Sequence, residues 1–410
     1  MNFFEQIEVV LLPLATQYTP EGSEPKAVVH QWIHAIANGA TPFAAERGAS
    51  TKKLTAALKM AQLYTDVESF KSQLPETPIK PAEKHTFTFI DLFAGIGGMR
   101  IGFQEAGGVC VFSSEFEKNA QATYCENHGD YPFGDITKIP VADIPDHDVL
   151  IAGFPCQPFS HAGLKKGIDD TRGTLFYNIA NILKEKKPKI ALLENVKGLI
   201  SNDKGNTLQV VLKTLIEIGY SCNIDREIII NGTPKQLQAE AKKMVLRSVD
   251  FGVPQNRQRI YIVLWIGELA KQFIYPVATH ENTRVGSILE ENPDPKYTIS
   301  TRLWKGHQRR KVNNVINGKG FGFSMVNEDS PYTSTISARY YKDGSEILIE
   351  QKGPNPRKLT PREAARLQGF PDCFKYNKSE VQAYKQFGNS VSVPVVIAIA
   401  NEISSQFLKG

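Results

Sequence analysis

Apolar and polar positions follow one pattern in the first 85 residues and another in the rest of the chain. Up to about residue 74, apolar side chains recur at helical spacing, and Ser50 precedes one such run, that of Leu54 and Leu58, where it can cap a helix. Three prolines in the polar stretch PETPIKPAEKHT (75–86) then indicate a linker. The pattern therefore predicts a helical N-terminal extension with its linker over residues 1–85.

From residue 86 onwards, short apolar runs alternate with amphipathic segments. The apolar runs have the length of buried strands, and the segments 174–184 and 207–218 between them have the spacing of helices. Strands and helices in alternation indicate an α/β fold with a doubly wound, mostly parallel sheet. The strand candidates are 86–93, 109–116, 149–154, 190–196 and 259–266.

This alternation stops after Gly267. Residues 268–356 are richer in Gly, Asn, Pro and basic side chains, and they hold only short strand-like runs such as 346–350. A helix candidate at 360–367 follows, and then an apolar segment, 391–403, that is fit to return to the sheet. The expected parts after the extension are a sheet domain at 86–267, a smaller domain at 268–370 and a C-terminal segment at 371–410.

Composition restricts the class of protein. The chain has 410 residues, 41% of them apolar and 22% charged, which suffices for a buried core and argues against a disordered chain. Its longest apolar runs, such as 393–400, are much shorter than the ~20 residues that span a bilayer, and no basic segment precedes the apolar start MNFFEQIEVV. Five cysteines without CxxC spacing argue against a disulfide framework and a zinc site. We therefore expect a soluble cytoplasmic protein without a bound metal.

Net charge is informative only when it is divided along the chain. The whole chain carries +5, but residues 296–366 hold 14 basic and 6 acidic side chains, a local +8 that leaves −3 for the remainder. A basic segment on a slightly acidic body is typical of a polyanion-binding surface, although a solvated lysine-rich face would have the same charge. The densest part is Arg309-Arg310-Lys311.

The segment FIDLFAGIGG (89–98) runs from an apolar strand straight into a glycine turn and then a helix. Glycine lets the backbone approach a ligand closely and adopt positive φ at such a turn. Glu115 lies about twenty residues further on, at the end of the next strand, where nucleotide-binding folds place an acid for ribose hydroxyls, and Asp135 lies about twenty residues beyond it. This register predicts a ligand of the adenosine type, without separating a dinucleotide from S-adenosylmethionine.

A cysteine follows the third predicted strand in GFPCQPFS (153–160). Cys156 stands on a rigid strand-to-loop turn flanked by Pro155 and Pro158, at the sheet edge where ligands bind. We therefore interpret it as a nucleophile rather than as an inert buried thiol. The residues after it, 161–173, are polar, glycine-bearing and basic, which is typical of a mobile lid.

Two further motifs place charged side chains at the ends of predicted strands. ALLENV (191–196) ends a strand with Glu194, which is either a capped structural acid or a functional carboxyl group. Beside an activated thiol we favour the functional role. QNRQRIYIV (255–263) places Arg257 and Arg259 on one face of a strand by its period of two, a pair that could equally be ordinary surface charge.

Six blocks of this chain resemble, in sequence and in order, those of DNA (cytosine-5)-methyltransferases of the bacterial restriction–modification type. The blocks are DLFAGIGG, GFPCQPFS, ENV, QNRQRIYIV, RKLTPREAARLQGFP and QFGNSVSVPVV. The resemblance covers roughly residues 86–405 and leaves 1–85 outside it. It implies the S-adenosylmethionine-dependent methyltransferase fold, with a target recognition domain at 268–370.

The resemblance also implies a role for each matching residue. Cys156 is the implied nucleophile, Glu194 binds the edge of the cytosine base, and Arg257 and Arg259 orient that base. The implied S-adenosylmethionine pocket consists of Phe93, Gly95, Gly97, Glu115, Phe116, Asp135, Ile136, Pro155, Leu175, Asn389 and Val391. The residues that we assign to DNA binding are Gln157, Ser160, Lys165, Lys166, Arg172, Arg309, Arg310, Arg339, Tyr340 and Lys342. The last three, in STISARYYKDGSEI with Asp343, are candidates for base reading or form a polar hairpin.

The chemistry of the reaction supports these roles. Carbon 5 of cytosine is a poor nucleophile, so a thiolate such as that of Cys156 first adds at carbon 6 and gives an enamine that can attack the methyl group of S-adenosylmethionine. Glu194 is suited to hold or donate a proton at ring nitrogen 3, where charge develops. The base cannot react inside a duplex, so it must be extruded into the site.

We therefore expect a bacterial, cytoplasmic enzyme that acts as a monomer on double-stranded DNA, away from membranes, and releases S-adenosylhomocysteine. A cognate restriction endonuclease is expected to be related to it by function. Methylation of tRNA cytosines by the same motifs is the first alternative, and the long basic segment favours DNA. A non-catalytic DNA-binding protein is disfavoured because Cys156, Glu194 and Arg259 are all present, and a dehydrogenase leaves GFPCQPFS and ENV unexplained. What the extension does stays open.

Overall fold

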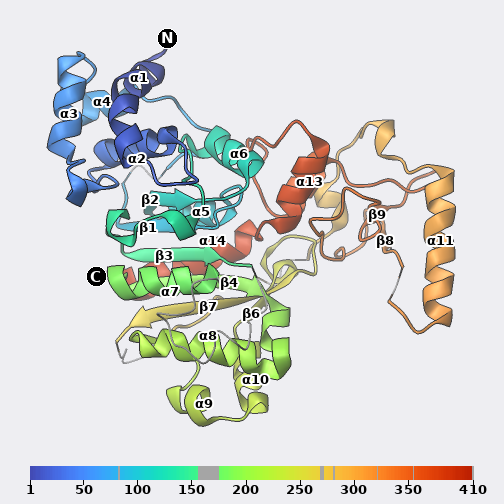
Figure 1. Ribbon diagram of the computed structural model, residues 1–410. Coiled ribbons are helices and arrows are strands. Elements are labelled where there is room, and N and C mark those ends of the chain that lie inside the picture. The colour runs from blue at the N-terminus through green and yellow to red at the C-terminus, as the bar shows by residue number, and fades with distance from the viewer. Residues whose placement is uncertain are drawn as a thin grey trace. The chain divides into compact units, whose positions relative to one another are not determined.

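The computed structural model describes residues 1–81, 84–155, 175–267, 272–279, 282–320, 322–353 and 355–408. The chain divides into two compact units, whose elements are labelled in Figure 1. Unit 1 consists of Met1–Val245, Arg259–Tyr275 and Ile399–Gly410, and unit 2 consists of Leu246–Gln258 and Pro276–Ala398.

Unit 1 is built on a sheet that has seven strands among the described residues. Its order is β2-β1-β3-β4-β7-β5, and β6, at the boundary between the units, pairs with β7. Strands β1 to β4 are parallel to one another, whereas β7 runs antiparallel to both β4 and β5. The strands are β1 (Phe87–Leu92), β2 (Gly108–Ser114), β3 (Val149–Gly153), β4 (Ile190–Val196), β5 (Tyr220–Ser221), β6 (Val245–Arg247) and β7 (Gln258–Ile266).

This mostly parallel α/β sheet confirms the predicted fold class. Every apolar run that we assigned to a strand is a strand, with ends that differ by at most two residues. Their cores are apolar at successive positions, as in 150–152 and 191–193, because both faces of a parallel sheet are covered. We did not predict β5 and β6, because runs of two or three residues carry no readable period.

Helices connect the parallel strands. Helix α5 packs against β1 and β2, and α8 packs against β5. The predicted helices at 174–184 and 207–218 are α7 and α8, each of which begins within one residue of the expected position. The helices of this part are α5 (Gly98–Glu105), α6 (Lys118–His128), α7 (Leu175–Lys186), α8 (Asn206–Glu217), α9 (Arg226–Asn231) and α10 (Pro234–Lys242).

The N-terminal extension is helical, as predicted, but it belongs to unit 1 and shares its core. Figure 1 shows its helices gathered at the β2 edge of the sheet. Trp32 and Phe43 are fully buried, Phe43 stacks on Phe112 of β2, and Gln31 Nε2 donates to the Val111 carbonyl, which covers the edge strand. Its helices are α1 (Phe3–Ala15), α2 (Pro25–Asn38), α3 (Thr51–Met60), which Ser50 caps as expected, and α4 (Val67–Ser72).

Unit 2 contains little regular sheet among its described residues. Its strands β8 and β9 are two residues long and pair in parallel. A buried ion pair supports it instead: Arg357 donates to both carboxylate oxygens of Glu363, at 2.7 and 2.8 Å. Its elements are α11 (Thr301–Ile316), β8 (Met325–Val326), β9 (Leu348–Ile349), α12 (Pro361–Leu367) and α13 (Glu380–Asn389).

The C-terminal segment returns later than expected. Residues 371–398, which we placed with the sheet domain, belong to unit 2, because Phe370, Phe374 and Phe387 pack together there. The apolar segment that follows forms helix α14 (Val393–Ile403), and the chain rejoins unit 1 only from Ile399.

The stretch Glu380–Leu408 has the length and the apolar composition of a helix that crosses a membrane. However, half of its most apolar 18-residue segment is buried, and extended backbone at Ser390 separates α13 from α14.

Short helices complete the fold. The 3-10 helices are η1 (Thr16–Tyr18), η2 (Ala45–Arg47), η3 (Ile136–Lys138), η4 (Val141–Asp143), η6 (Lys197–Ile200), η7 (Asn202–Gly205), η8 (Ser248–Phe251), η9 (Val285–Ile288) and η10 (Pro295–Tyr297), and a π-helical turn, η11 (Ser404–Leu408), ends the described chain.

Candidate active site

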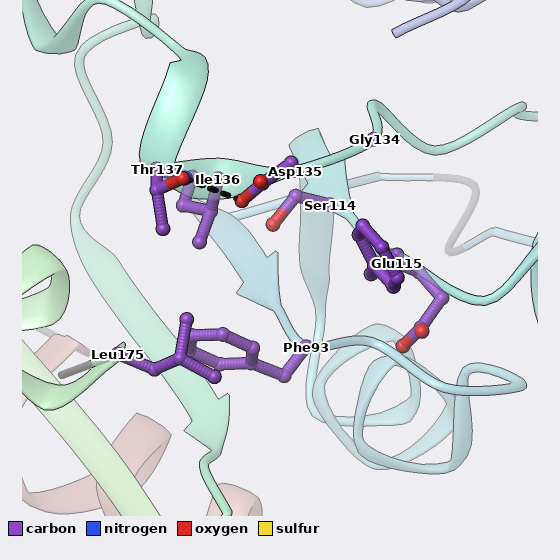
Figure 2. A pocket seen from close by; sticks show the side chains of 9 residues that line it. Phe93, Ser114, Glu115, Gly134, Asp135, Ile136, Thr137 and Leu175 are labelled. Atoms are coloured by element: carbon purple, nitrogen blue, oxygen red, sulfur yellow. Dashed lines mark hydrogen bonds between the residues drawn. The ribbon is translucent and has the colours of Figure 1, made fainter. Parts of the chain in front are cut away.

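A cavity of about 270 Å³ lies at the carboxyl ends of β1 and β2, beside the glycine turn (Figure 2). In Figure 2, Phe93 and Leu175 lie on one side, and the segment from Gly134 to Thr137 lies across the cavity from them. The lining consists of Phe93, Ser114, Glu115, Phe116, Gly134, Asp135, Ile136, Thr137 and Leu175. Apolar walls with two carboxylates suit a ligand that has a flat base and hydroxyl groups.

The turn between β1 and α5 depends on its glycines. Gly95 and Gly97 have positive φ, 56° and 86°, and so does Phe93, at 56°, which is rare for a residue with a side chain. A Cβ on Gly97 would lie 2.1 Å from Nε2 of the buried His128. Glycine is therefore required at position 97 both by the backbone angle and by the space behind it.

Glu115 follows β2, and its carboxylate turns back to the glycine turn. Its Oε2 accepts a hydrogen bond from the Gly95 N–H at 2.8 Å, and its Oε1 accepts one from the Glu117 N–H at 2.8 Å. Burial raises the pKa of Glu115 above its usual value, against the opposing effect of these backbone donors. Because each carboxylate oxygen has two lone pairs, both oxygens keep acceptor capacity for ribose hydroxyls.

Asp135 and Phe116 present two further groups to the cavity. Within the described part of the chain, the hydrogen bonds of Asp135 go to Oδ1, from the N–H and the hydroxyl of Thr137 at 3.0 and 2.8 Å. Its Oδ2 can therefore accept a bond from an amino group of a ligand. The Phe116 side chain is 76% exposed, so its ring is accessible for packing against a flat base.

The cavity brings together only part of the predicted cofactor set. Phe93, Glu115, Phe116, Asp135, Ile136 and Leu175 line it. Gly95 and Gly97 shape the turn without lining the cavity, Pro155 is exposed beyond β3, and Asn389 and Val391 belong to unit 2. Sequence reasoning missed Ser114, Gly134 and Thr137, although each lies within two residues of a predicted carboxylate.

Glu194 and Arg259 form an ion pair at the carboxyl end of β4. The Nε of Arg259 lies 3.2 Å from Oε1 of Glu194, and only 16% and 10% of the two side chains are exposed. On the other side of β4, Gly153 of β3 pairs with Glu194, and a Cβ there would lie 3.5 Å from Oε2. An ion pair this little exposed to water holds its carboxylate in a defined orientation.

The predicted nucleophile and lid lie outside the described residues. These positions include Cys156, Gln157, Ser160, Lys165, Lys166 and Arg172. The structure describes the chain up to Pro155: Phe154 is buried, and its carbonyl accepts a hydrogen bond from Nδ2 of Asn195 at 2.9 Å. Asn195, to which we had assigned no role, thus anchors the backbone two residues before the cysteine, and it directly follows Glu194.

Three of the described cysteines are poor alternatives as nucleophiles. Burial raises the pKa of the Cys110 and Cys125 thiols to about 12 and that of Cys222 to about 11, so the reactive thiolate is suppressed. Cys373 is exposed and belongs to unit 2. Among the described residues, no group of three or more His, Cys, Asp or Glu side chains could hold a metal ion.

Arg257 does not share the position of Arg259. Strand β7 begins at Gln258, so Arg257 precedes the strand and belongs to unit 2. It is 3% exposed, and its guanidinium donates to the carbonyls of Ile336, Gly388 and Ser390. The period-two argument placed both arginines on one strand face, whereas Arg257 lies just before the strand and donates to backbone carbonyls near the end of α13. Its expected role in orienting the base stays a prediction.

The residues assigned to DNA binding in unit 2 differ in accessibility. Arg309, Arg339 and Lys342 are exposed, and Arg310 forms an ion pair with Asp343 at 3.0 Å. Tyr340 is fully buried, and its hydroxyl donates to the Ile347 carbonyl and accepts from the Leu359 N–H. We therefore assign Tyr340 to the core of unit 2 and withdraw it from the base-reading residues.

Comparison with known proteins places this arrangement in a family. The C-5 cytosine-specific DNA methylase family matches residues 87–405. The chain is 56% identical to the type II methyltransferase M.SsoII of Shigella sonnei over 336 residues, which cover 81% of this chain and 84% of that protein. It is also 56% identical to the type II methyltransferase M.NlaX of Neisseria lactamica over 322 residues, or 78% and 96% of the two chains.

Solved structures agree on the fold. The S. pombe Dnmt2 methyltransferase superimposes with a TM-score of 0.61 over 78% of this chain and 99% of its own, at 23% identity. At that identity the likeness concerns the fold alone, whereas the match over residues 87–405 and the bacterial relatives show the family. The chain belongs to the C-5 cytosine-specific DNA methylases and is a DNA (cytosine-5)-methyltransferase.

Proposed function

We propose that this enzyme methylates carbon 5 of a cytosine extruded from a specific duplex DNA site, with S-adenosylmethionine as donor and through a covalent adduct with Cys156. The observation that carries the proposal is the Glu194–Arg259 ion pair, 3.2 Å apart, at the carboxyl end of β4. It lies beside Gly153, from which the Cys156 segment leaves, while β1 and β2 of the same parallel sheet end at the cavity. Thiol, acid and cofactor would thus meet at one edge of the sheet.

The chain's own residues would act in sequence on the extruded base. The Cys156 thiolate forms a bond from Sγ to carbon 6, and electron density moves through the ring to carbon 5 while Glu194 holds a proton at nitrogen 3. Arg259 keeps the Glu194 carboxyl group turned to the base. After carbon 5 has gained the methyl group, its proton passes to water, the double bond between carbons 5 and 6 re-forms as the bond from Sγ to carbon 6 breaks, and nitrogen 3 returns its proton to Glu194, which regenerates the thiolate and the acid.

The cavity residues fit S-adenosylmethionine, which supplies an electrophilic methyl group when it is bound. Glu115 has acceptor capacity left on both oxygens for the ribose hydroxyls, and Asp135 has Oδ2 for the exocyclic amine of adenine. Phe93, Phe116 and Leu175 supply apolar contacts for the base. Glycine at 95 and 97 lets the backbone approach the rest of the molecule.

A DNA substrate is favoured by the basic face of α11. Arg302, Lys305 and Arg309 are exposed and follow one another at spacings of three and four residues, so they lie on one side of the helix. Such a row can contact successive phosphates of a duplex. With relatives named as type II methyltransferases, we propose further that the enzyme is a cytoplasmic bacterial monomer that protects host DNA from a cognate restriction endonuclease.

The test combines activity with trapping of the adduct. Bisulfite sequencing of DNA from a host that expresses the protein should reveal one methylated cytosine in a recurring sequence. A duplex with 5-fluorocytosine at that position should form a denaturation-resistant complex with the wild-type protein, because fluorine at carbon 5 cannot leave as a proton does. Cys156→Ser should form none, whereas Cys373→Ser, the matched change at an exposed cysteine, should trap as well as wild type.

Other outcomes would decide between the alternatives. Methylation of tRNA without methylation of duplex DNA would overturn the choice of substrate while leaving the chemistry intact. Specific DNA binding with neither methylation nor trapping would indicate a non-catalytic protein. Methyl groups on exocyclic amines, or full turnover of Cys156→Ser, would contradict the mechanism itself.

A further inference from the structure

We propose that the N-terminal extension forms part of the cofactor site: its turn at Gly22 and Ser23 positions the wall of the cavity formed by Gly134 and Asp135. The inference rests on the proposed function, because it takes the cavity to hold S-adenosylmethionine. It assigns a role to a segment that lies outside the family match, which begins at residue 87.

The turn touches the wall directly. The Gly134 N–H donates a hydrogen bond to Oγ of Ser23 at 3.0 Å. A Cβ on Gly134 would lie 1.9 Å from the Gly22 carbonyl oxygen, so the two backbones are in van der Waals contact at a residue that lines the cavity. Gly22 has a φ of 77°, and a Cβ there would lie 3.5 Å from Cβ of Asp135. The turn therefore sets how far the wall can move outward.

The turn is itself held in place. It is closed by a hydrogen bond from the Ser23 N–H to the Pro20 carbonyl, at 3.1 Å. Next to it, Glu24 accepts hydrogen bonds from the Lys118 ammonium at 2.6 Å and from the Tyr131 hydroxyl at 3.1 Å. The Lys118 hydrogen bond, above all, lowers the pKa of Glu24 to about 2, so this carboxylate stays charged at neutral pH.

The wall needs such a support because it is not a strand of the sheet. Phe133 is tied to β2, since its N–H donates to the Ser113 carbonyl and its carbonyl accepts from the Glu115 N–H, at 2.9 and 2.8 Å. At Gly134 the hydrogen bond of the backbone N–H goes to the Ser23 side chain instead. Asp135, the predicted partner of the adenine amine, comes directly afterwards. A small displacement of this backbone would therefore change the distance between that carboxylate and the amine.

The experiment measures binding of S-adenosylhomocysteine to the full-length protein by isothermal titration calorimetry. Ser23→Ala leaves the buried Gly134 N–H without its acceptor, and we expect the Kd to rise about three- to tenfold. The KM for S-adenosylmethionine should rise by the same factor while kcat at saturation is unchanged. Ser23→Thr, which keeps a hydroxyl at this position, should restore binding. Ser50→Ala, which removes the cap of α3 in the same extension, serves as the matched control and should bind normally.

The result separates this inference from the proposed function. If the wild type binds S-adenosylhomocysteine and Ser23→Ala binds it equally well, the positioning role is wrong and the function stands. A loss of kcat without a change in KM, or equal losses in Ser23→Ala and Ser50→Ala, would also overturn it, because a general loss of structure predicts those patterns. If the wild type binds no S-adenosylhomocysteine at all, the proposed function fails first.

Discussion

Unit 1 and unit 2 differ in how their cores are organised. In unit 1 the strands of a parallel sheet supply an apolar core, with residues 150–152 and 191–193 fully buried. Unit 2 has, among its described residues, two strands of two residues each, and charged or polar side chains such as Arg357, Glu363 and Tyr340 are buried inside it. Unit 2 also buries apolar residues such as Phe370, Phe374 and Phe387, but where unit 1 has a sheet, unit 2 joins its segments by hydrogen bonds of individual buried side chains.

This difference determines how a functional side chain is placed. Glu194 is positioned by strand register, because a residue at the end of β4 lies at the edge where all the parallel strands end. Arg257 is positioned by three backbone carbonyls of its own unit. Arg259, two residues later, lies on β7 and reaches Glu194. Two arginines that are close in the sequence thus have their described contacts in different units.

Breaking the buried ion pair of unit 2 should have the largest effect. Glu363→Ala removes the acceptor of both Arg357 hydrogen bonds and of the Thr360 N–H, and it leaves a guanidinium group buried without its partner. We expect the free energy of unfolding of unit 2 to fall by about 3–5 kcal/mol. Hydrogen exchange followed by mass spectrometry, resolved to peptides of each unit, would measure it.

The matched control for this prediction is an ion pair on the surface of the same unit. Asp372 bonds Arg366 at 2.8 Å, but 64% of its side chain is exposed. Asp372→Ala should therefore lower stability by less than about 1 kcal/mol. Similar losses in the two variants would show that burial does not determine how much an ion pair contributes to the stability of unit 2.

Glu194→Gln tests a side chain of unit 1 that is positioned by strand register. The variant keeps the size and register of the side chain but loses the carboxyl group that we propose to hold a proton at nitrogen 3 of the base. We expect kcat for methyl transfer to fall about 10²- to 10³-fold, with unfolding of unit 1 changed by no more than about 1 kcal/mol. Single-turnover assays would measure the chemical step, with Glu217→Gln, an exposed acid at the end of α8 in the same unit, as control. A rate equal to that of wild type would remove Glu194 from the mechanism.

The contrast also explains what could be predicted from the sequence. The five longer strands of unit 1, and the acids Glu115 and Glu194 at the ends of two of them, followed from apolar runs and their spacing, because register in a parallel sheet turns sequence position into spatial position. Most of unit 2 has no such period. The basic charge of unit 2 could be predicted from the sequence. The burial of Tyr340 could not, because the two hydrogen bonds of its hydroxyl to the backbone depend on tertiary packing.

The extension shows the same limit inside unit 1. Its helices and the cap at Ser50 were predicted from local spacing. The contact of Ser23 with Gly134 joins residues 111 positions apart. No periodicity encodes a contact of one hydroxyl with one backbone N–H at that separation, so neither Ser23 nor Gly134 could be assigned to the site beforehand.

A buried acid gives unit 1 a pH dependence that can be tested. Asp91 on β1 is fully buried, and burial raises its pKa to about 8, so the folded protein holds a proton that the unfolded chain releases above its ordinary value of 3.8. Stability from this group is therefore present below about pH 4 and is lost as the pH rises towards 8. Asp91→Asn should remove this loss. In urea denaturation, the free energy of unfolding of the variant, relative to that of the wild type, should therefore rise from pH 5 to pH 8.

Asp148 is the control for this effect. Partial burial would raise its pKa, but hydrogen bonds from Thr88 and the Lys189 ammonium outweigh burial and lower it below the usual value. The stability that the Asp148 carboxylate contributes is lost only at acid pH. The free energy of unfolding of Asp148→Asn should therefore differ from that of the wild type by a constant amount between pH 5 and pH 8. A constant offset for Asp91→Asn as well would show that Asp91 is ionised in the folded protein.

The smallest effect is expected on the basic helix of unit 2, where neighbouring arginines differ in their partners. Arg310 is paired with Asp343 and also donates to His307, whereas Arg309 is exposed on the face with Arg302 and Lys305. If that face contacts phosphates, Arg309→Ala should weaken DNA binding about two- to fivefold and reduce the slope of log Kd against log salt by about one. Arg310→Ala should change the slope less, because Asp343 already balances its charge. Equal slopes for both variants and the wild type would place the DNA on another surface, and a larger change for Arg310 would mean that its ion pair opens when DNA binds.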